Sequence, residues 1–362
     1  MTNVVLAGGG TAGHTSPLIA TAKAVLRAEP GASITCIGTA KGLETRVIPA
    51  AGLELKLIDP VPMPRKPNLD LAKLPVRLVR SVRQARTILR DASADVLVGF
   101  GGYVSIPAYL AARSLRVPVV VHEANALPGI SNKIGARFAR YVGVTFPGTP
   151  LPRGELIGMP VAWSISHPDL TPGQARETFG LDPDRPTLLV SGGSQGAVAI
   201  NAALLGARDD LLAAGVQILH VLGPKNMTDD HVVEKHANGA RYVPVAFVEN
   251  MAHAYAAADF MVGRSGAGTV VETAMSGVPC LFVPLPYGNG EQARNSAPLV
   301  AAGGGVLVDN ADLTPARLVA EVLPRITDPD VLAAMSRAAR DYSPRDADDR
   351  LAAAIATAAR KV

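Results

Sequence analysis

Cysteines, aromatic residues and charges are all scarce in this chain of 362 residues. The two cysteines, Cys36 and Cys280, lie in separate apolar runs, so we expect buried thiols and neither a disulfide framework nor a metal site. No window approaches 18 uninterrupted apolar residues and no basic leader opens the chain, so we expect no membrane-spanning helix and no targeting segment. These absences favour a protein of the reducing cytoplasm.

Hydrophobic residues, in contrast, make up 48% of the chain, alongside 35 glycines and 29 prolines. Such a composition excludes a disordered protein and is typical of an α/β protein with many tight turns. The length is comfortable for two domains that each bury a core. A net charge of +4 is too small to name a partner.

Short apolar runs alternate with helical stretches, which predicts parallel sheets covered by helices. Strands are predicted at 4–7, 33–38, 54–58, 95–99, 118–122 and 141–145, and again at 187–190, 216–222, 241–245, 259–263 and 279–283. A strand, a glycine turn and a helix at 4–28, with the helix from about Pro17, recur at 187–213. We therefore predict two Rossmann-like domains, 1–160 and 161–344, joined through the Pro/Gly-rich stretch 151–163, with 345–362 returning to the first.

Residues 259–277 predict a buried strand, a glycine turn and a helix that opens at the turn. Unpaired N–H groups and the helix dipole at such an opening favour a phosphate or diphosphate. Glu272, one turn inside the helix, is placed to accept hydrogen bonds from a ribose diol. Together these features predict a nucleotide site; an ordinary strand-to-helix turn is the alternative.

Gly8, Gly10 and Gly13 match the dinucleotide fingerprint, but the acidic residue expected after the second strand is absent at 39–41. NAD is therefore disfavoured. His14, on the same turn, is the candidate general base because an imidazole is readily neutral near pH 7. A structural histidine that caps the following helix is the alternative.

Further polar groups follow other predicted strands. In the first half they are the turn 99–103 and the run 122–125, in which we expect Glu123 and Asn125 to face substrate and His122 to face inward. In the second half they are the turn 192–196, with Ser194 as a hydroxyl donor, and Glu291, Gln292 and Asn295, which could bind a sugar. The turn 192–196 also matches the G-x-S-x-G elbow of serine hydrolases, but no acid and histidine follow in the order that a triad needs. Paired aspartates lie in loops and at helix starts, so we expect no metal.

Residues 65–90 are strongly basic, with the arginines of a predicted helix flanking Val76, Val79 and Val82. This pattern suits an anionic membrane surface, and a solvated basic face is the alternative. Nucleic acid is disfavoured because the stretch has no aromatic residues for stacking. The basic residues are Arg65, Lys66, Lys73, Arg77, Arg80, Arg83, Arg86 and Arg90, against the single acid Asp70.

Taken together, the motifs resemble those of one family, the peptidoglycan UDP-N-acetylglucosamine transferases known as MurG. The matching segments run in the family's order through GGGTAGH (8–14), GFGGYVSIPA (99–108), HEANALPGISNK (122–133), GMPV (158–161), SGGSQGAVAIN (191–201), FVENMAHAYAAAD (247–259), RSGAGTVVETAMSGVPCLFVPLP (264–286) and EQARNSAPL (291–299). The resemblance implies a GT-B glycosyltransferase with two Rossmann-like domains facing across a cleft. The implied reaction is inverting and needs no metal or cofactor. It transfers N-acetylglucosamine from UDP-GlcNAc to the 4-hydroxyl of the MurNAc-pentapeptide on undecaprenyl diphosphate, at the cytoplasmic face of the plasma membrane.

The resemblance also assigns residues. It places His14 as candidate base, and we add Glu123 as a second catalytic candidate from its place after a strand. The donor-contacting positions are Thr11, Ala12, Gly13, Asn125, Ser194, Val248, Ala267, Gly268, Thr269, Val270, Val271, Glu272 and Gln292. Val248 would meet the uracil, Glu272 the ribose and Gln292 the sugar. The strip at 65–90 matches the region by which the family meets the membrane.

Three positions depart from the family pattern, which often has Gly, Asn and Arg where this chain has Ala12, Met159 and Ala162. The arginine acts on the nucleotide in the family, so its absence predicts a substitute neighbour or weaker donor binding. The enzyme alternative is a non-hydrolysing UDP-GlcNAc 2-epimerase, which needs no lipid acceptor. The alternative that is not an enzyme is a nucleotide-sugar binding protein without catalytic activity.

Overall fold

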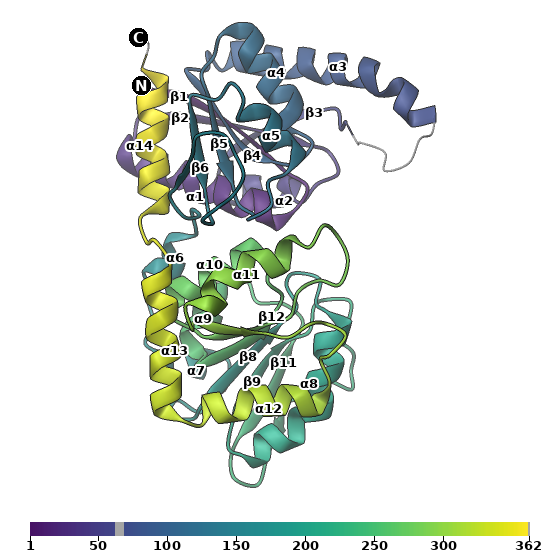
Figure 1. The fold of residues 1–362 in the computed structure, drawn as a ribbon, viewed down its shortest axis with the longest axis vertical. Coiled ribbons are helices and arrows are strands. Elements are labelled where there is room, and N and C mark those ends of the chain that lie inside the picture. Colours follow the sequence, from purple (N-terminus) through teal and green to yellow (C-terminus); the bar gives the residue numbers. More distant parts are fainter. Residues whose placement is uncertain (62–68, 361–362) are drawn as a thin grey trace. The chain divides into compact units, whose positions relative to one another are not determined.

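The computed structural model describes residues 1–61 and 69–360, and the chain divides into two compact units (Figure 1). The first unit comprises Met1–Ala162 and Asp346–Val362, and the second comprises Trp163–Arg345. The chain therefore leaves the first unit, forms the whole of the second, and returns to the first for its last helix.

The first unit is built on a parallel sheet of seven strands in the order β3-β2-β1-β4-β5-β6-β7. The strands are β1 (Asn3–Gly8), β2 (Ser33–Thr39), β3 (Glu54–Ile58), β4 (Val96–Gly101), β5 (Val119–Glu123), β6 (Tyr141–Val144) and β7 (Gly154–Leu156). The central strands are buried along their length, as their continuous Val/Leu runs require of a sheet covered on both faces. The strand β7 lies within the stretch predicted as a linker, so most of that stretch belongs to the first unit.

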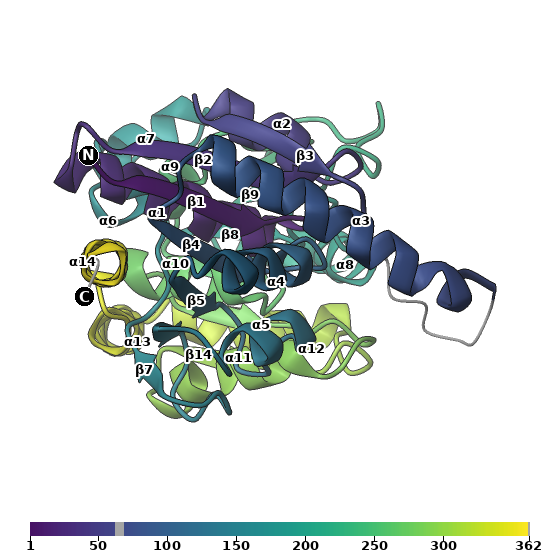
Figure 2. The same ribbon diagram turned by 90° about the horizontal axis from the view of Figure 1, so that it is seen from above.

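Helices cover both faces of this sheet. The helices are α1 (Ala12–Ala28), α2 (Glu44–Ala50), α3 (Leu69–Asp91), α4 (Ser105–Leu115), α5 (Ile130–Gly135) and α14 (Ala347–Ala359). One core cluster joins α1, α2 and α14 to the sheet, and another joins α3 and α4 to the opposite face. At its N-terminal end, α3 extends beyond the sheet of its unit (Figures 1 and 2). The prediction that the first helix begins near Pro17 is wrong: it begins at Ala12, because the glycine turn itself enters the helix.

The second unit repeats this architecture with the strand order β10-β11-β9-β8-β12-β13-β14. The strands are β8 (Thr187–Ser191), β9 (Gln217–Val221), β10 (Glu234–Lys235), β11 (Arg241–Val245), β12 (Phe260–Gly263), β13 (Cys280–Phe282) and β14 (Gly305–Leu307). All neighbours are parallel except the short edge strand β10, which runs antiparallel to β11. The prediction of parallel sheets is confirmed apart from this edge, but the strands β7, β10 and β14 were not predicted.

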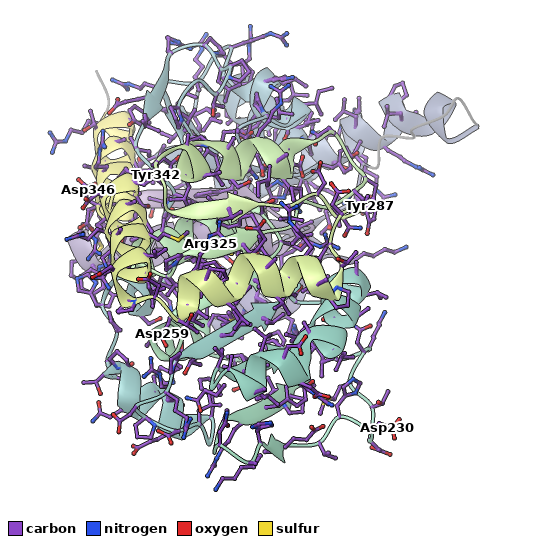
Figure 3. The ribbon with its side chains drawn as sticks, turned by 60° about the horizontal axis from the view of Figure 1, so that its bottom comes forward. Asp230, Asp259, Tyr287, Arg325, Tyr342 and Asp346 are labelled. Atoms are coloured by element: carbon purple, nitrogen blue, oxygen red, sulfur yellow. The ribbon has the colours of Figure 1, made fainter. Side chains whose placement is uncertain are left out.

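The helices of the second unit are α6 (Trp163–Ser166), α7 (Pro172–Thr178), α8 (Val198–Ala213), α9 (Met251–Ala257), α10 (Ala267–Ser276), α11 (Glu291–Ala301), α12 (Pro315–Ile326) and α13 (Pro329–Tyr342). A core cluster joins α8 and α12 to one face of the sheet. Asp259, labelled in Figure 3, precedes β12 and accepts two hydrogen bonds from Nη2 of Arg176, at 2.9 and 2.8 Å. Both cysteines are free and buried, as predicted.

Candidate functional site

In each unit the predicted site residues lie where the order of the strands reverses. In the first unit the reversal falls between β1 and β4, where the turns 8–13 and 101–103 leave the sheet. In the second it falls between β8 and β12, where the turn 192–196 and the start of α10 leave the sheet. Ligands of open α/β sheets bind outside the carboxyl ends of the strands at this reversal. The topology therefore places a candidate ligand site in each unit.

His14 lies in the first turn of α1, with its imidazole directed back at the glycine turn. Its Nδ1 lies 3.0 Å from the carbonyl oxygen of Gly9 and 3.3 Å from Oγ1 of Thr11. A carbonyl oxygen only accepts hydrogen bonds, so the neutral imidazole carries its proton on Nδ1. The lone pair is then on Nε2, the nitrogen that a general base uses.

The second glycine turn approaches this imidazole so closely that it has no room for side chains. A Cβ on Gly101 would lie 3.0 Å from Nε2 of His14, and a Cβ on Gly102 would lie 2.6 Å from the oxygen of Gly9. Both glycines also have positive φ angles, of 100° and 79°. The two turns are thus packed backbone to backbone around His14, which explains the glycines at 101 and 102.

Glu123 ends β5, where the sequence places it toward substrate. The structure turns its carboxylate inward, with 3% of the residue exposed. Burial raises the pKa of Glu123, although hydrogen bonds from the loop oppose that shift. The donors are the N–H groups of Asn125 (2.9 Å) and Gly129 (3.0 Å) and Nδ2 of Asn132 (2.9 Å). These contacts make Glu123 the anchor of segment 124–132, which comprises a loop and the start of α5, and its catalytic role stays a prediction.

His122 is fully buried, in agreement with its predicted inward orientation. Its Nε2 lies 2.9 Å from the carbonyl oxygen of Gly158, and burial lowers the pKa of the imidazole to about 4. Beside it, the hydroxyl of Tyr109 donates to Oδ1 of Asn132 at 2.7 Å. This neutral, hydrogen-bonded layer supports the loop that carries Asn125.

In the second unit, α10 begins at the glycine turn as predicted. Gly266 is its N-cap and supplies no side-chain cap, so the N–H groups of its first turn have no acceptor from the helix itself. A Cβ on Gly266 would meet nothing within 4 Å, and one on Gly268 would meet only Oε1 of Glu272, at 3.8 Å. The opening of α10 is therefore not filled by side chains, and its geometry suits an anion.

Glu272 follows one turn inside α10 and receives a hydrogen bond at Oε2 from the hydroxyl of Tyr255, at 2.9 Å. Burial raises the pKa of Glu272 to about 7, although the Tyr255 bond opposes the shift. Oε1 is the carboxylate oxygen nearest to Gly268. The Tyr255 contact thus fixes Oε2 and presents the other oxygen toward the helix opening.

Other donor positions differ in exposure. Ser194 lies exposed on the turn 192–196, whereas Val248 is 7% exposed. Gln292 is half-buried, and its Oε1 accepts a hydrogen bond from the N–H of Leu285 at 3.0 Å. Thr11, Ala12 and Gly13 are exposed at the start of α1. The predicted donor positions thus fall in both units, and six of them lie in α10.

Three residues of these sites were not predicted. Glu44 accepts a hydrogen bond from the N–H of Gly10 at 2.8 Å, and Tyr255 binds Glu272 as above. Arg264, next to the turn before α10, donates through Nη1 to the oxygens of Val283, Pro284 and Asn310, at 3.1, 3.0 and 2.8 Å. An arginine directly before a glycine turn is a signal that the sequence does offer for an anion site.

The basic stretch is described only in part, since 62–68 lie outside the described residues. Within α3, Val76 and Val79 are 74% and 51% exposed, whereas Val82 packs against the core, so the predicted apolar strip is shorter than expected. A pocket of about 430 Å³ lies beside it, lined by Lys41, Asp59, Pro60, Val76, Arg77 and Arg80. Arg80 pairs with Asp59 at 2.7 Å.

The chain matches two family models that together span most of its length. The Glycosyltransferase family 28 N-terminal domain matches residues 4–144, and the Glycosyltransferase family 28 C-terminal domain matches residues 187–351. A relative from Cutibacterium acnes is 58% identical over 100% of this chain and 99% of its own length. A relative from Streptomyces coelicolor is 50% identical over 99% of this chain and all of its own. Both are named UDP-N-acetylglucosamine–N-acetylmuramyl-(pentapeptide) pyrophosphoryl-undecaprenol N-acetylglucosamine transferase.

Solved structures of glycosyltransferases also match this chain. The crystal structure of Acinetobacter baumannii MurG matches with a TM-score of 0.77 and 28% identity, over 99% of this chain and 100% of that one. The calicheamicin glycosyltransferase CalG4 matches with a TM-score of 0.69 and 17% identity, over 99% and 98%, which shows a shared fold alone. With two Rossmann-like domains and full-length similarity to named relatives, this chain belongs to the MurG family of glycosyltransferases.

Proposed function

We propose that this protein transfers N-acetylglucosamine from UDP-N-acetylglucosamine to the 4-hydroxyl of the N-acetylmuramyl sugar of an undecaprenyl-diphosphate-linked MurNAc-pentapeptide. The observation that carries the proposal is the 58% identity over the full length to a relative that bears this activity in its name. The transfer inverts the configuration of the sugar and uses no bound metal. Its product is the disaccharide-bearing lipid of peptidoglycan synthesis.

The donor nucleotide binds the second unit in this proposal. The N–H groups that open α10 donate hydrogen bonds to the diphosphate, whose charge grows as the sugar leaves, and each pre-aimed donor contributes about 2.7 to 4 kcal/mol by analogy with oxyanion holes. Glu272, held by Tyr255, accepts hydrogen bonds from the ribose hydroxyls. Support comes from the open backbone at Gly266 and Gly268, which leaves room for a ligand.

The acceptor hydroxyl loses its proton to His14 in this proposal. The contact between Nδ1 and the oxygen of Gly9 supports this role, because it leaves the lone pair on Nε2. The attack comes from the face opposite the leaving diphosphate, which accounts for inversion. Glu123 acts on this side through the segment 124–132 that it anchors.

The remaining donor contacts carry over by position from the family pattern. They are Thr11, Ala12, Gly13 and Asn125 in the first unit, and Ser194, Val248, Ala267, Gly268, Thr269, Val270, Val271 and Gln292 in the second. Where the family has an arginine this chain has Ala162, so we propose that the nucleotide relies more on the opening of α10 and on Glu272. Weaker donor binding is the expected consequence.

The lipid acceptor requires the protein to reach a membrane surface, and we propose that α3 makes this contact at the cytoplasmic face. Val76 and Val79 are exposed, and Arg77, Arg80 and Arg83 lie on the same helix. Within residues 1–61 and 69–360, no helix is long and apolar enough to cross a bilayer. The proposed association is therefore peripheral and electrostatic, with shallow insertion of the valines.

The test is transfer of labelled N-acetylglucosamine to a short-chain analogue of the lipid acceptor, with and without chelator. We expect acceptor-dependent transfer that EDTA leaves unchanged, loss of transfer in His14→Gln, and weaker donor binding in Glu272→Ala. Asp312→Ala, an exposed acid of the second unit outside the assigned site segments, is the control. Conversion of the donor to a mannose isomer without acceptor would show an epimerase instead, and tight UDP binding without turnover would show a non-catalytic binder.

A further inference from the structure

Glu44, at the start of α2, is a fully buried carboxylate directly under the glycine turn 8–13. Its Oε2 accepts the N–H of Gly10 at 2.8 Å. Its Oε1 accepts the N–H and the hydroxyl of Thr39, at 3.0 and 2.9 Å, at the end of β2. Burial alone would raise the pKa of Glu44, but these donors outweigh it and hold the pKa below its usual value. The group is therefore an ionised carboxylate that joins β2 to the turn.

Three glycines make the space that Glu44 occupies. A Cβ on Gly9 would lie 2.5 Å from Oε1, and a Cβ on Gly38 would lie 2.6 Å from Cγ of Glu44. At Gly42 an added Cβ would overlap the carboxylate itself. The residues around Glu44 are thus small on three sides, although the sequence places them on three different segments.

The contact with Gly10 determines how the preceding peptide group is oriented. In a planar trans peptide the N–H and the C=O point in opposite directions. Because the N–H of Gly10 points at Glu44, the carbonyl of Gly9 points away from it, and this is the carbonyl that lies 3.0 Å from Nδ1 of His14. One peptide group therefore connects the buried carboxylate on one side to the imidazole on the other.

We propose that Glu44 is a positioning residue for His14, acting through the Gly9–Gly10 peptide group. The carboxylate fixes the direction of the Gly9 carbonyl, and that carbonyl holds the proton of the imidazole on Nδ1 and the lone pair on Nε2. Charge on Glu44 also strengthens the carbonyl as an acceptor, since hydrogen bonds in a chain polarise one another. In many enzymes a carboxylate binds the catalytic histidine directly and holds its proton on one ring nitrogen. Here the carboxylate would have the same effect through an intervening peptide group. The proposal rests on the proposed function of His14 as base.

The variant Glu44→Gln tests the proposal, because it keeps the size of the side chain and removes its charge. The amide cannot accept from Gly10 and Thr39 through both of its terminal atoms. We expect kcat for transfer to the short-chain acceptor to fall about 10- to 100-fold, the range found for outer partners of metal-bound histidines. KM for UDP-N-acetylglucosamine should stay within about twofold, since the donor site on α10 is untouched.

Two comparisons separate positioning from general support of the fold. Glu54→Gln, an acid on β3 whose side chain is 54% exposed, should leave kcat unchanged. In a His14→Gln background, Glu44→Gln should cause no further loss of kcat, because the group that it positions is gone. An equal loss in both backgrounds, or a kcat within twofold of the parent, would overturn the proposal.

The tautomer of His14 can also be measured by NMR, which tests the role of Glu44 independently of catalysis. In protein labelled with ¹⁵N-histidine, the signals of His14, identified by their absence in His14→Gln, should show the proton on Nδ1. Glu44→Gln should convert them to a mixture of both tautomers, and an unchanged tautomer would overturn the proposal. If His14→Gln keeps full transfer, the base assignment fails by itself, while the imidazole signal still decides the role of Glu44. If Glu44→Gln does not fold, Glu44→Asp, which shortens the side chain, should shift the tautomer in the same direction.

Discussion

The hydroxyl of Tyr255 donates a hydrogen bond to Oε2 of Glu272 at 2.9 Å, and this pair joins α9 to the helix that opens the candidate nucleotide site. We predict that Tyr255→Phe raises KM for UDP-N-acetylglucosamine about 3- to 10-fold, because the carboxylate loses a bond of about 1 to 1.5 kcal/mol that orients it. Steady-state kinetics at varied donor concentration measure this, and kcat should change less than KM. A loss confined to kcat would contradict the assignment of Glu272 to the donor.

Glu272 also makes the stability of the protein depend on pH. Its folded pKa of about 7 lies above the ordinary value of 4.5, so its stabilising effect is complete below about pH 4.5 and is lost as the pH rises through 7. Glu272→Gln keeps an oxygen acceptor for Tyr255 and removes the charge. We predict that the variant is more stable than the parent at pH 8, by about 1 to 3 kcal/mol, and equal to it near pH 4.5. Urea unfolding at both pH values measures this; a difference independent of pH would refute it.

Gly102 tests the close approach of the two glycine turns. In Gly102→Ala the new Cβ would lie 2.6 Å from the oxygen of Gly9, the acceptor of His14, and the φ of 79° adds strain. We predict at least a tenfold loss of transfer. Gly52→Ala is the matched control: its φ is 77°, nothing lies within 4 Å of the added Cβ, and it should cost about 1 to 2 kcal/mol of stability without loss of transfer. Equal effects of the two changes on transfer would show that the contact with Gly9 is unimportant.

Asp259 and Arg176 test what holds the second unit together. Asp259 also accepts the N–H of Thr187 at 2.7 Å, so Asp259→Asn leaves the guanidinium and this N–H competing for one oxygen. We predict a loss of about 3 kcal/mol in the free energy of unfolding, as for other buried pairs. Asp169→Asn, an exposed acid with a side chain 68% exposed, should change it by less than about 0.5 kcal/mol. Similar losses in both variants would disprove this role.

The exposed valines of α3 test the membrane proposal. The double change Val76→Asp and Val79→Asp should weaken binding to vesicles that contain anionic phospholipid at least tenfold, since a fully buried valine contributes roughly 1.5 kcal/mol or more and the proposed shallow insertion buries each valine only in part. Co-sedimentation at low and high salt measures this, and the parent should bind less at high salt. Val233→Asp, at a residue 63% exposed in the second unit, is the control. Unchanged binding of the double variant would remove α3 from the proposed surface.

Apolar runs predicted the sheets well because a strand buried on both faces has to be apolar along its whole length. The glycine turns after β1 and β8 were also predictable, because only glycine allows the positive φ and the close approach there.

The contacts that orient the site residues were harder to predict from the sequence. The sequence has no acid at 39–41, and nothing in it predicts that Glu44 turns inward to Thr39 and Gly10. Tyr255 lies in an alanine-rich helix and resembles an ordinary core residue until the fold brings it to Glu272. Glu123 lies at the end of its strand as predicted, but only the path of the segment 124–132 decides that its carboxylate faces inward.

The return of the chain to its first unit has a consequence for biosynthesis. Leu351 and Ile355 of α14 are part of the core that α1 and β1 form, yet the ribosome makes them after the entire second unit. The second unit is one continuous segment and can fold as soon as it emerges. Until α14 emerges, the part of the first core that it covers stays exposed, so the second unit can complete its fold before the first unit does.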